Sequence, residues 1–228
     1  VPDEPAPTAA RQILWCVLAA TGSLLLLAVS NHITQNIAAV PLLWIAPLAI
    51  YLLTFILCFD GKGWYRRDTF LSMLAAALCV MAWTLADTNL THELALQIGV
   101  FCGGLFVACM FCHGELVGAK PAPRYLTRFY LMISLGGALG SALVGIAAPL
   151  VLPAYFELAG GLVVTALLLL WQVRRGHLVF GALATAAVLT TAGCAVWGIV
   201  EFYNDTIVTA RNFYGVLRVK EHGRDSTS

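Results

Sequence analysis

Seven apolar runs, each about as long as a membrane-spanning helix, follow one another along this chain. They cover residues 13–30, 42–59, 69–87, 94–112, 128–152, 157–173 and 178–203. A helix needs about 20 residues to cross roughly 30 Å of hydrocarbon, whereas a strand of a membrane barrel has about 10 residues of alternating polarity. The runs therefore predict an all-α fold, a polytopic transmembrane helical bundle with about seven spans.

The composition requires lipid as part of the solvent. Of 228 residues, 60% are hydrophobic and 11% are charged. A soluble domain has about 25% charged residues, because it needs a polar surface. The net charge is +1, and no basic cluster is interleaved with stacking aromatic residues. We therefore expect the lipid bilayer as a partner and no nucleic acid.

Polar segments flank the apolar region. Residues 1–12 are rich in Pro and Ala and are interpreted as a linker or an N-terminal tail. Residues 13–203 form the predicted transmembrane bundle, and residues 204–228 form a polar C-terminal tail. The sequence thus predicts one membrane domain between two polar ends.

Basic residues alternate between the predicted loops. The turns 30–41, 87–93 and 153–156 contain no Lys or Arg, whereas the loops after the second, fourth and sixth runs are basic. The positive-inside rule places these basic loops and the N-terminus in the cytoplasm. Seven spans would place the tail on the outer side, although it carries Arg211, Arg218, Lys220 and Arg224.

Small residues recur at helix spacing in two of the runs. The fourth run contains Gly99 and Gly103, and the fifth contains Gly136, Gly137, Gly140 and Ser141. Such patterns let helix backbones approach closely in a membrane. We interpret them as helix-packing residues within the bundle, with a dedicated surface for a partner as the alternative.

Polar side chains at the ends of the runs are the candidate site residues. Asn31, His32 and Gln35 lie between the first two runs, where His32 could act as a titratable gate. An ordinary capped turn is the alternative there. His113 and Glu115 follow the fourth run. They could form a proton or ion site at the membrane boundary, or could pair with neighbouring Lys and Arg.

The residues Cys109, Cys112 and His113 match the pattern for attachment of c-type haem. The pattern lies at the end of a predicted helix on the cytoplasmic side, whereas this haem is attached on the outer side of a bacterial membrane. We therefore expect no haem and interpret the cysteines as structural. The sequence shows no nucleotide loop, no G-x-S-x-G, no H-E-x-x-H and no acidic metal pair, so it predicts no catalytic, cofactor-binding or metal-ligating residue.

Several stretches carry a family resemblance when taken together. They are LWIAPLAIYL (43–52), CHGEL (112–116), KPAPRYLT (120–127), FYLMISLGGALG (129–140) and ARNFYGVL (210–217). As a set they resemble the bacterial fused MFS-transporter-like/spermidine-synthase membrane proteins. The resemblance implies the linker and second helical group of such a protein, in a bacterial inner membrane. The tail resembles the start of the synthase-like domain, but that enzyme's nucleotide loop and catalytic acidic residues have no counterpart.

Three functions follow as alternatives. The first is a non-catalytic membrane subunit or anchor that packs with other membrane subunits or a complementary helical half. The second is a transporter-like half-bundle that moves a small solute past Asn31, His32 and Gln35 and the Gly-rich fifth run. The third is a membrane enzyme or redox protein that uses Cys109, Cys112 and His113. No charged residue lies near the middle of a run, which argues against a self-sufficient pump and favours the first function.

Overall fold

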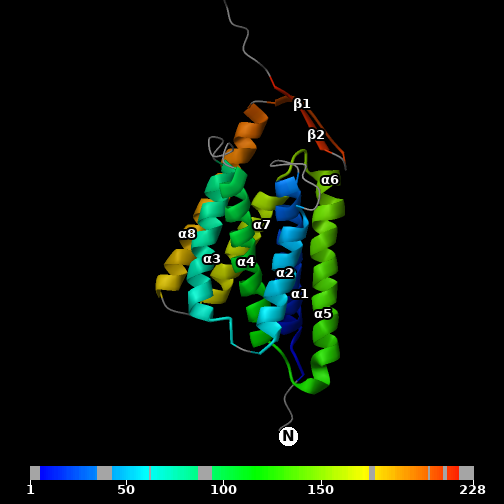
Figure 1. The fold of residues 1–228 in the computed structure, drawn as a ribbon, viewed down its shortest axis with the longest axis vertical. Coiled ribbons are helices and arrows are strands. Elements are labelled where there is room, and N and C mark those ends of the chain that lie inside the picture. Colours follow the sequence, from blue (N-terminus) through cyan, green and yellow to red (C-terminus); the bar gives the residue numbers. More distant parts are fainter. Residues whose placement is uncertain are drawn as a thin grey trace, which may run out of the picture.

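The computed structural model describes residues 6–34, 43–61, 63–86, 94–174, 178–204, 206–212 and 215–220. For Leu94 and for the residues from 206 onward it describes the backbone only. The chain forms a bundle of apolar helices with a two-stranded hairpin at one end (Figure 1). The predicted all-α helical bundle is confirmed.

The elements follow one another in an up-and-down order. The helices are α1 (Ala9–His32), α2 (Ile45–Phe59), α3 (Arg67–Ala86), α4 (Leu94–Gly118), the short 3₁₀ helix η3 (Pro123–Tyr125), α5 (Leu126–Ala142), the π-helical turn η4 (Leu143–Ala147), α6 (Ala148–Val151), α7 (Glu157–Val173) and α8 (Leu178–Asn204). The hairpin consists of β1 (Thr206–Asn212) and β2 (Gly215–Lys220), which pair antiparallel.

The apolar helices of the bundle differ in length. Within the described residues, five helical stretches are long and apolar enough to cross a membrane: Ala9–His32, Arg67–Ala86, Ala95–Gly118, Pro123–Val151 and Leu178–Asn204. The apolar helices α2 and α7 have 15 and 17 residues. At 1.5 Å per residue they are roughly 22 and 25 Å long, short of the ~30 Å hydrocarbon layer. Of the about seven expected spans, the described residues thus contain five helices of membrane-spanning length and two shorter apolar helices.

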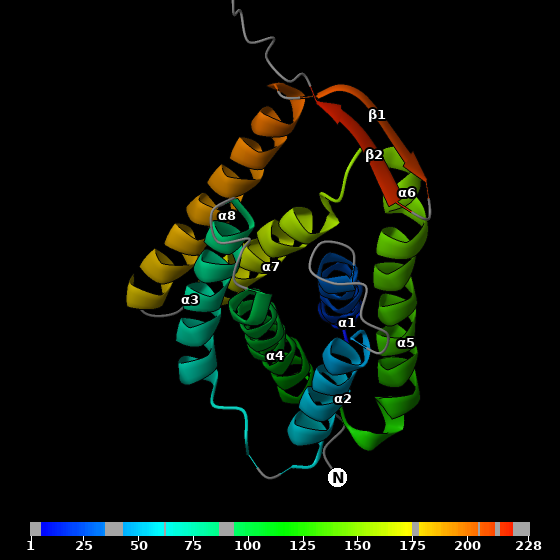
Figure 2. The same ribbon diagram turned by 45° about the horizontal axis from the view of Figure 1, so that its top comes forward.

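The helices α1 and α4 form the centre of the bundle. Helix α1 packs against α2, α4, α5 and α7, and α4 packs against α1, α2 and α3. Figure 2 shows α5 on one side of this centre, beside α1, and α8 on the other, beside α3 and α7. Trp15 from α1 and Phe101 from α4 are fully buried in the shared core. The tight packing of such side chains holds the central helices together.

Close contact between α1 and α5 depends on two glycines of the fifth run. A Cβ atom added at Gly136 would collide with the backbone carbonyl of Cys16, and one added at Gly140 would collide with that of Ala20. Both pairs are spaced by four residues, so the two helices meet backbone to backbone over a full turn. Trp15 extends this contact, with its ring edge-on to that of Phe129 at 5.1 Å between centroids.

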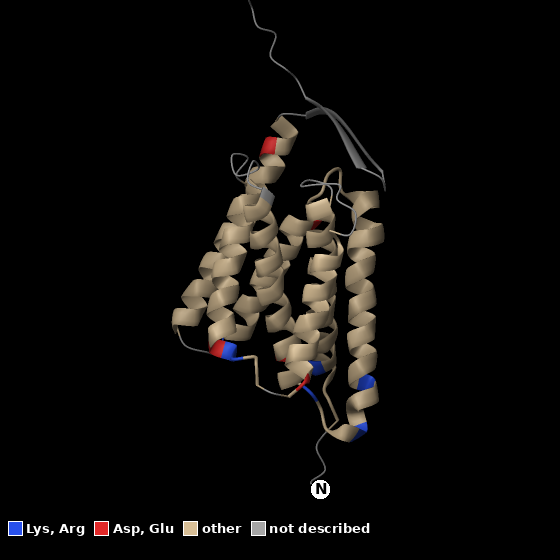
Figure 3. Cartoon of the chain, in the orientation of Figure 1, with Lys and Arg blue, Asp and Glu red and all other residues tan. Residues whose placement is uncertain are grey.

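The two ends of the bundle differ in charge. Lys and Arg gather at the end where the N-terminus lies, which we call the basic end (Figure 3). The opposite end holds Glu157, Glu201 and the hairpin, whose strands contain Arg211, Arg218 and Lys220. The described basic side chains thus follow the alternation of basic loops in the sequence, and the hairpin adds basic residues at the other end.

Candidate functional site

The carboxylate of Glu115 organises a polar network at the basic end. Arg67 at the start of α3 donates from Nε to Glu115 Oε1 over 2.8 Å, and the hydroxyl of Tyr65 donates to the same oxygen over 2.9 Å. Gln172 near the end of α7 donates from its side-chain amide to Glu115 Oε2 over 3.0 Å. The network therefore ties α3, α4, α7 and the loop before α3 to one carboxylate.

The two charges in this network differ in exposure. The side chain of Glu115 is 11% exposed, whereas that of Arg67 is 51% exposed. Arg67 Nη2 also donates to the backbone carbonyl of Gln172 over 3.3 Å, which helps to hold the guanidinium in place. Such a half-exposed ion pair contributes modestly to stability, and much of its value lies in positioning.

Tyr65 lies outside the membrane-spanning helices and packs directly on α4. Its ring covers Gly114, where an added Cβ atom would collide with the ring carbons. Burial raises the pKa of the Tyr65 phenol well above its usual value of 10.0, and the negative charge of Glu115 raises it further. The phenol therefore stays protonated at neutral pH and remains a donor to the carboxylate.

A cavity of about 420 Å³ opens beside this network. It is lined by Leu14, Tyr65, Arg67, Gly114, Glu115, Gly118, Ala119 and Gln172. Next to it, Arg11 Nη2 and Trp15 Nε1 both donate to the carbonyl of Ala119, over 3.0 and 3.1 Å. These bonds satisfy a backbone acceptor just beyond the C-terminus of α4, where a cation is also favoured by the helix dipole.

His113 lies deeper in the bundle, away from the cavity. Its ring is 1% exposed, and its Nδ1 is 3.1 Å from the hydroxyl of Thr54 in α2. Tyr51 and Phe55, also in α2, approach the ring edge-on at 5.0 and 5.2 Å between centroids. On the other side, Gly22 of α1 leaves room for Nε2 of the imidazole. His113 is thus a buried ionisable group between three helices.

The predicted end of the fourth helix at residue 112 is wrong, since α4 continues to Gly118. His113 and Glu115 therefore lie within α4, not beyond it. Their side chains point to different environments: His113 contacts α2, whereas Glu115 contacts α3 and α7. One of the two arrangements expected for Glu115 is present in the structure: its carboxylate pairs with a neighbouring Arg, Arg67.

The cysteines of the haem-like pattern are buried in the core. Cys109 and Cys112 are fully buried in α4, and all seven cysteines of the chain are unpaired thiols. The thiol of Cys58 in α2 approaches the sulfur of Met110 at 3.7 Å. Among the residues that the structure describes, no group of three or more His, Cys, Asp or Glu side chains is arranged to hold a metal ion. The absence of haem remains a prediction from the sequence.

The other predicted polar site lies at the opposite end of the bundle. Asn31 and His32 belong to the last turn of α1, and the ring of His32 packs on Phe101 at 4.4 Å between centroids. Gln35 lies outside the described residues. Since α1 and α4 are antiparallel neighbours, the structure separates Asn31 and His32 from His113 and Glu115. The five predicted site residues do not form one site.

The small-residue motifs differ in what they contact. Gly136 and Gly140 pack on α1, and a Cβ atom at Gly137 would lie 3.3 Å from the hydroxyl oxygen of Ser23, while the next residue of the motif, Ser141, is half-buried. By contrast, no described atom lies within 4 Å of a Cβ atom built at Gly99 or Gly103. Both of these glycines are on the exposed side of α4.

Sequence reasoning did not find the partners of the two ionisable groups in α4. In the sequence, Tyr65 and Arg67 lie in the basic loop after the second run, with nothing that links them to Glu115, and Gln172 and Thr54 carry no signal. Their one common feature is a polar group near the end or on the buried side of an apolar run, and such groups need partners in a bilayer.

Comparisons of the chain with protein-family models, with curated proteins and with solved structures find no match. The class of the protein therefore rests on its own fold. Five apolar helices of membrane-spanning length, a buried apolar core and outward-facing apolar side chains define a polytopic α-helical membrane protein.

Proposed function

We propose that the chain is a non-catalytic membrane subunit or anchor that packs into a larger membrane assembly. The observation that carries this proposal is the surface formed by Gly99 and Gly103 on α4. A helix surface that meets lipid alone has no need of small residues, whereas a helix that approaches another helix does. The second small-residue motif, at Gly136 and Gly140, is occupied by α1. Of the two motifs, the one on α4 is therefore the one whose glycines no described atom covers.

The interior packing supports an anchor more than a conduit. On its inward side α4 presents Phe101, Leu105 and Phe111, all fully buried. These side chains belong to one continuous core that also includes Leu18 and Leu74. A centre filled by large apolar side chains suits a rigid membrane unit that holds other parts in place.

The experiment is purification in a mild detergent followed by chemical cross-linking and mass photometry. The expected result is a stoichiometric complex with another membrane chain, which Gly99→Leu and Gly103→Leu disrupt. Gly181→Leu, in α8, is the matched control. It makes the same change of Gly to Leu, and no described atom lies within 4 Å of a Cβ atom built at Gly181. A monomer that carries no partner, or a complex indifferent to both α4 variants, would overturn the proposal.

The finer identity is part of the same proposal. We place the chain in a bacterial inner membrane with its N-terminus in the cytoplasm, as the second helical group of the fused MFS-transporter-like/spermidine-synthase family. The basic residues at the N-terminal end support this orientation (Figure 3). The hairpin after α8 supports a link to a sheet-containing domain, because its backbone is already extended and paired. Tagging each end with a reporter of cytoplasmic or periplasmic location tests the orientation.

A transporter-like half-bundle is the second candidate, and His113 is the observation that favours it. An ionisable side chain that is 1% exposed inside a membrane bundle is a candidate for proton or ion transfer. Solute uptake into proteoliposomes should then stop in His113→Gln, while Glu201→Gln at the opposite end leaves it unchanged. Equal uptake by wild type and His113→Gln would exclude this candidate.

A further inference from the structure

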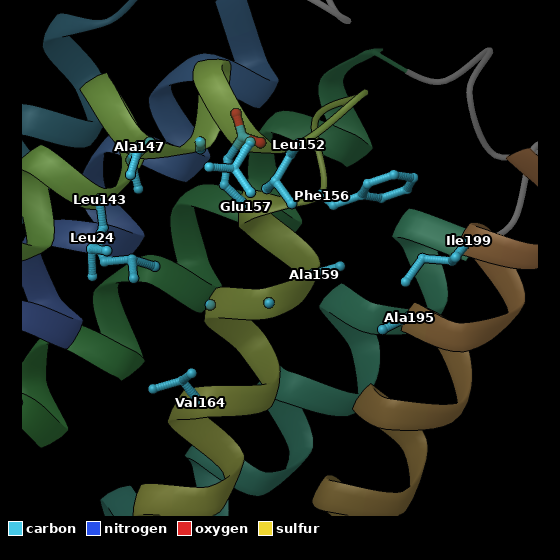
Figure 4. Close-up of a pocket in the computed structure, with 15 residues that line it drawn as sticks. Leu24, Leu143, Ala147, Leu152, Phe156, Glu157, Ala159, Val164, Ala195 and Ile199 are labelled. Atoms are coloured by element: carbon cyan, nitrogen blue, oxygen red, sulfur yellow. The ribbon is translucent and has the colours of Figure 1, made fainter.

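Two cavities of the bundle differ in the chemistry of their walls. The cavity at the hairpin end has a volume of about 480 Å³ and mostly apolar walls, and its one carboxylate, Glu157, already has a partner in the chain (Figure 4). The cavity of about 420 Å³ at the basic end is lined by the polar side chains of Tyr65, Arg67, Glu115 and Gln172. Polar groups that converge on a cavity give a ligand its orientation and specificity. The basic end therefore offers the better site for a specific ligand.

Arg11, in the first turn of α1, lies beside this cavity with its guanidinium group held in place. Its Nε and Nη2 donate to the carbonyl of Ala119 over 3.3 and 3.0 Å, and Ala119 lines the cavity. The guanidinium carbon also lies 5.8 Å from the centre of the Trp15 ring. Among the described residues Nη1 has no partner, so its two N–H groups remain for a ligand. An anion bound there meets a donor group that is already ordered.

A second cation lies next to Arg11. Nη2 of Arg11 donates to the backbone carbonyl of Lys120 over 3.4 Å, and the ammonium group of Lys120 has no partner in the described part of the chain. The carboxylate of Glu115 on the cavity wall is paired with Arg67 over 2.8 Å. Arg11 and Lys120 therefore present two positive charges that no described carboxylate neutralises, and guanidinium and ammonium groups both bind phosphate.

The surrounding basic end is positive as well (Figure 3). Besides Arg11 and Lys120, its described helix ends and loops contain the basic residues Arg66, Arg67, Arg124, Arg128 and Arg174, against the acidic residues Asp60, Asp68 and Glu115. The segments 1–5, 62 and 175–177 lie outside the described residues and contain Asp3, Glu4, Lys62 and Arg175, whose charges cancel. An anion at Arg11 thus lies in an excess of positive charge.

Apolar surface begins next to these charges. Ile13, two residues after Arg11 in α1, is 62% exposed, and Leu131 in the neighbouring helix α5 is 61% exposed. Both belong to helical stretches of membrane-spanning length, which start at the basic end (Figure 1). Cations at the helix ends and apolar side chains deeper along the same helices match the two parts of a phospholipid.

We propose that Arg11 and Lys120 bind the phosphate of an anionic phospholipid, phosphatidylglycerol, and that the basic-end cavity takes its glycerol head group. An uncharged head group with hydroxyls suits the cavity, because the ion pair on its wall is already closed. The side-chain oxygen of Gln172 has no partner among the described residues and accepts from such a hydroxyl. The acyl chains then lie against Ile13 and the exposed side of α5.

The test is native mass spectrometry of the delipidated protein, titrated with phosphatidylglycerol and with phosphatidylcholine of the same acyl chains, which has no net charge. The expected result is one phosphatidylglycerol bound about tenfold more tightly than phosphatidylcholine. Arg11→Gln should remove this preference, a change equivalent to ~1.4 kcal/mol. Lys120→Gln should weaken phosphatidylglycerol binding about threefold, and it tests the site even if Arg11→Gln does not fold, because Lys120 is exposed.

A variant of the cavity and two controls separate the site from general attraction. Gly118 lines the cavity and no described atom lies within 4 Å of a Cβ atom built there, so Gly118→Leu should also weaken phosphatidylglycerol binding about tenfold. Gly193→Leu, in α8, is its control, since an added Cβ atom is equally unobstructed there. Arg66→Gln removes an exposed charge at the same end outside the cavity and should leave the binding within about twofold of wild type.

Four results would overturn the proposal. One is equal binding of the two lipids by wild type, and another is binding by Arg11→Gln and Lys120→Gln that equals that of Arg66→Gln. A loss caused instead by Arg218→Gln would place the lipid at the hairpin. Glycerol 3-phosphate, which has the head-group chemistry without acyl chains, should bind far more weakly, and equal binding would make a free phosphate the ligand. Neutralising Asp3 and Glu4 together should change the affinity less than twofold, because a tenfold gain would show that the N-terminal tail occupies Arg11 and would also overturn the proposal.

Discussion

Replacing Glu115 by Gln tests whether the network at the basic end holds the helices together. The two carboxylate oxygens accept from Arg67, Tyr65 and Gln172 over 2.8, 2.9 and 3.0 Å. A Gln side chain keeps the shape but has one accepting oxygen. With that oxygen facing Arg67 and Tyr65, its amide nitrogen faces the amide nitrogen of Gln172, donor against donor.

The cost follows from these contacts. An unsatisfied, partly buried donor costs about 1–3 kcal/mol, and Gln172 lies at the low end of this range because it is half-buried. Loss of the ion pair adds at most ~1 kcal/mol, since Arg67 is 51% exposed. We therefore expect Glu115→Gln to destabilise the protein by about 2 kcal/mol, and a double-mutant cycle with Arg67→Met to give a coupling energy of ~1 kcal/mol.

The measurement is reversible unfolding in bicelles with increasing dodecyl sulfate. Thiol labelling provides the signal, because Cys58, Cys109 and Cys112 are buried in the folded bundle and become reactive when it opens. Glu201→Gln, an exposed carboxylate at the opposite end, is the control. The reasoning is refuted if Glu115→Gln lies within ~0.5 kcal/mol of wild type or is no less stable than Glu201→Gln.

Three more predictions use the same unfolding assay or a simple titration. Gly140→Ala should destabilise the protein by about 1–3 kcal/mol, because the added Cβ atom collides with the α1 backbone. Gly145→Ala is the control and should leave the stability unchanged, because no described atom lies within 4 Å of its added Cβ atom. Equal effects of the two variants would contradict the close α1–α5 contact. Thr54→Val should cost roughly 1 kcal/mol, since it removes the partner of the His113 ring, and an unchanged stability would show that this bond contributes nothing. Because the pKa of Tyr65 is raised in the folded protein, its contribution to the free energy of unfolding is complete below pH 10 and is lost as the pH rises above that value. The difference in phenolate absorbance between wild type and Tyr65→Phe should therefore appear only when the protein unfolds. A phenolate that forms near pH 10 in the folded protein would refute this.

Hydrophobic runs in the sequence predict the helices well because a bilayer allows few alternatives. The run 157–173 coincides with α7, and the run 178–203 ends one residue before α8 does. The largest error is at the end of α4, which runs to Gly118 and not to residue 112. The polar residues there resemble a loop. They remain helical because Glu115 has partners on neighbouring helices, and partners from distant segments leave no local signal.

The candidate site was predictable only in its central residues. His113 and Glu115 stand out as ionisable groups beside a long apolar run. Tyr65, Arg67 and Gln172 reach Glu115 from two other helices and a loop, so no spacing along the chain relates them. The π-helical turn was likewise not predicted, because its residues are as apolar as those of an ordinary membrane helix.

The shortness of α2 and α7 has a consequence for the membrane around the protein. With 15 and 17 residues they leave several ångströms of a ~30 Å hydrocarbon layer without a helix of matching length. The surrounding leaflets must bend inward toward these helix ends, or water must reach below the level of the head groups there. Bending the leaflets costs elastic free energy, and this cost rises with the mismatch between helix length and bilayer thickness. The protein is therefore accommodated best in a thin membrane. The free energy of the bundle in a membrane should therefore depend on bilayer thickness mainly through α2 and α7, and only weakly through the five long helices.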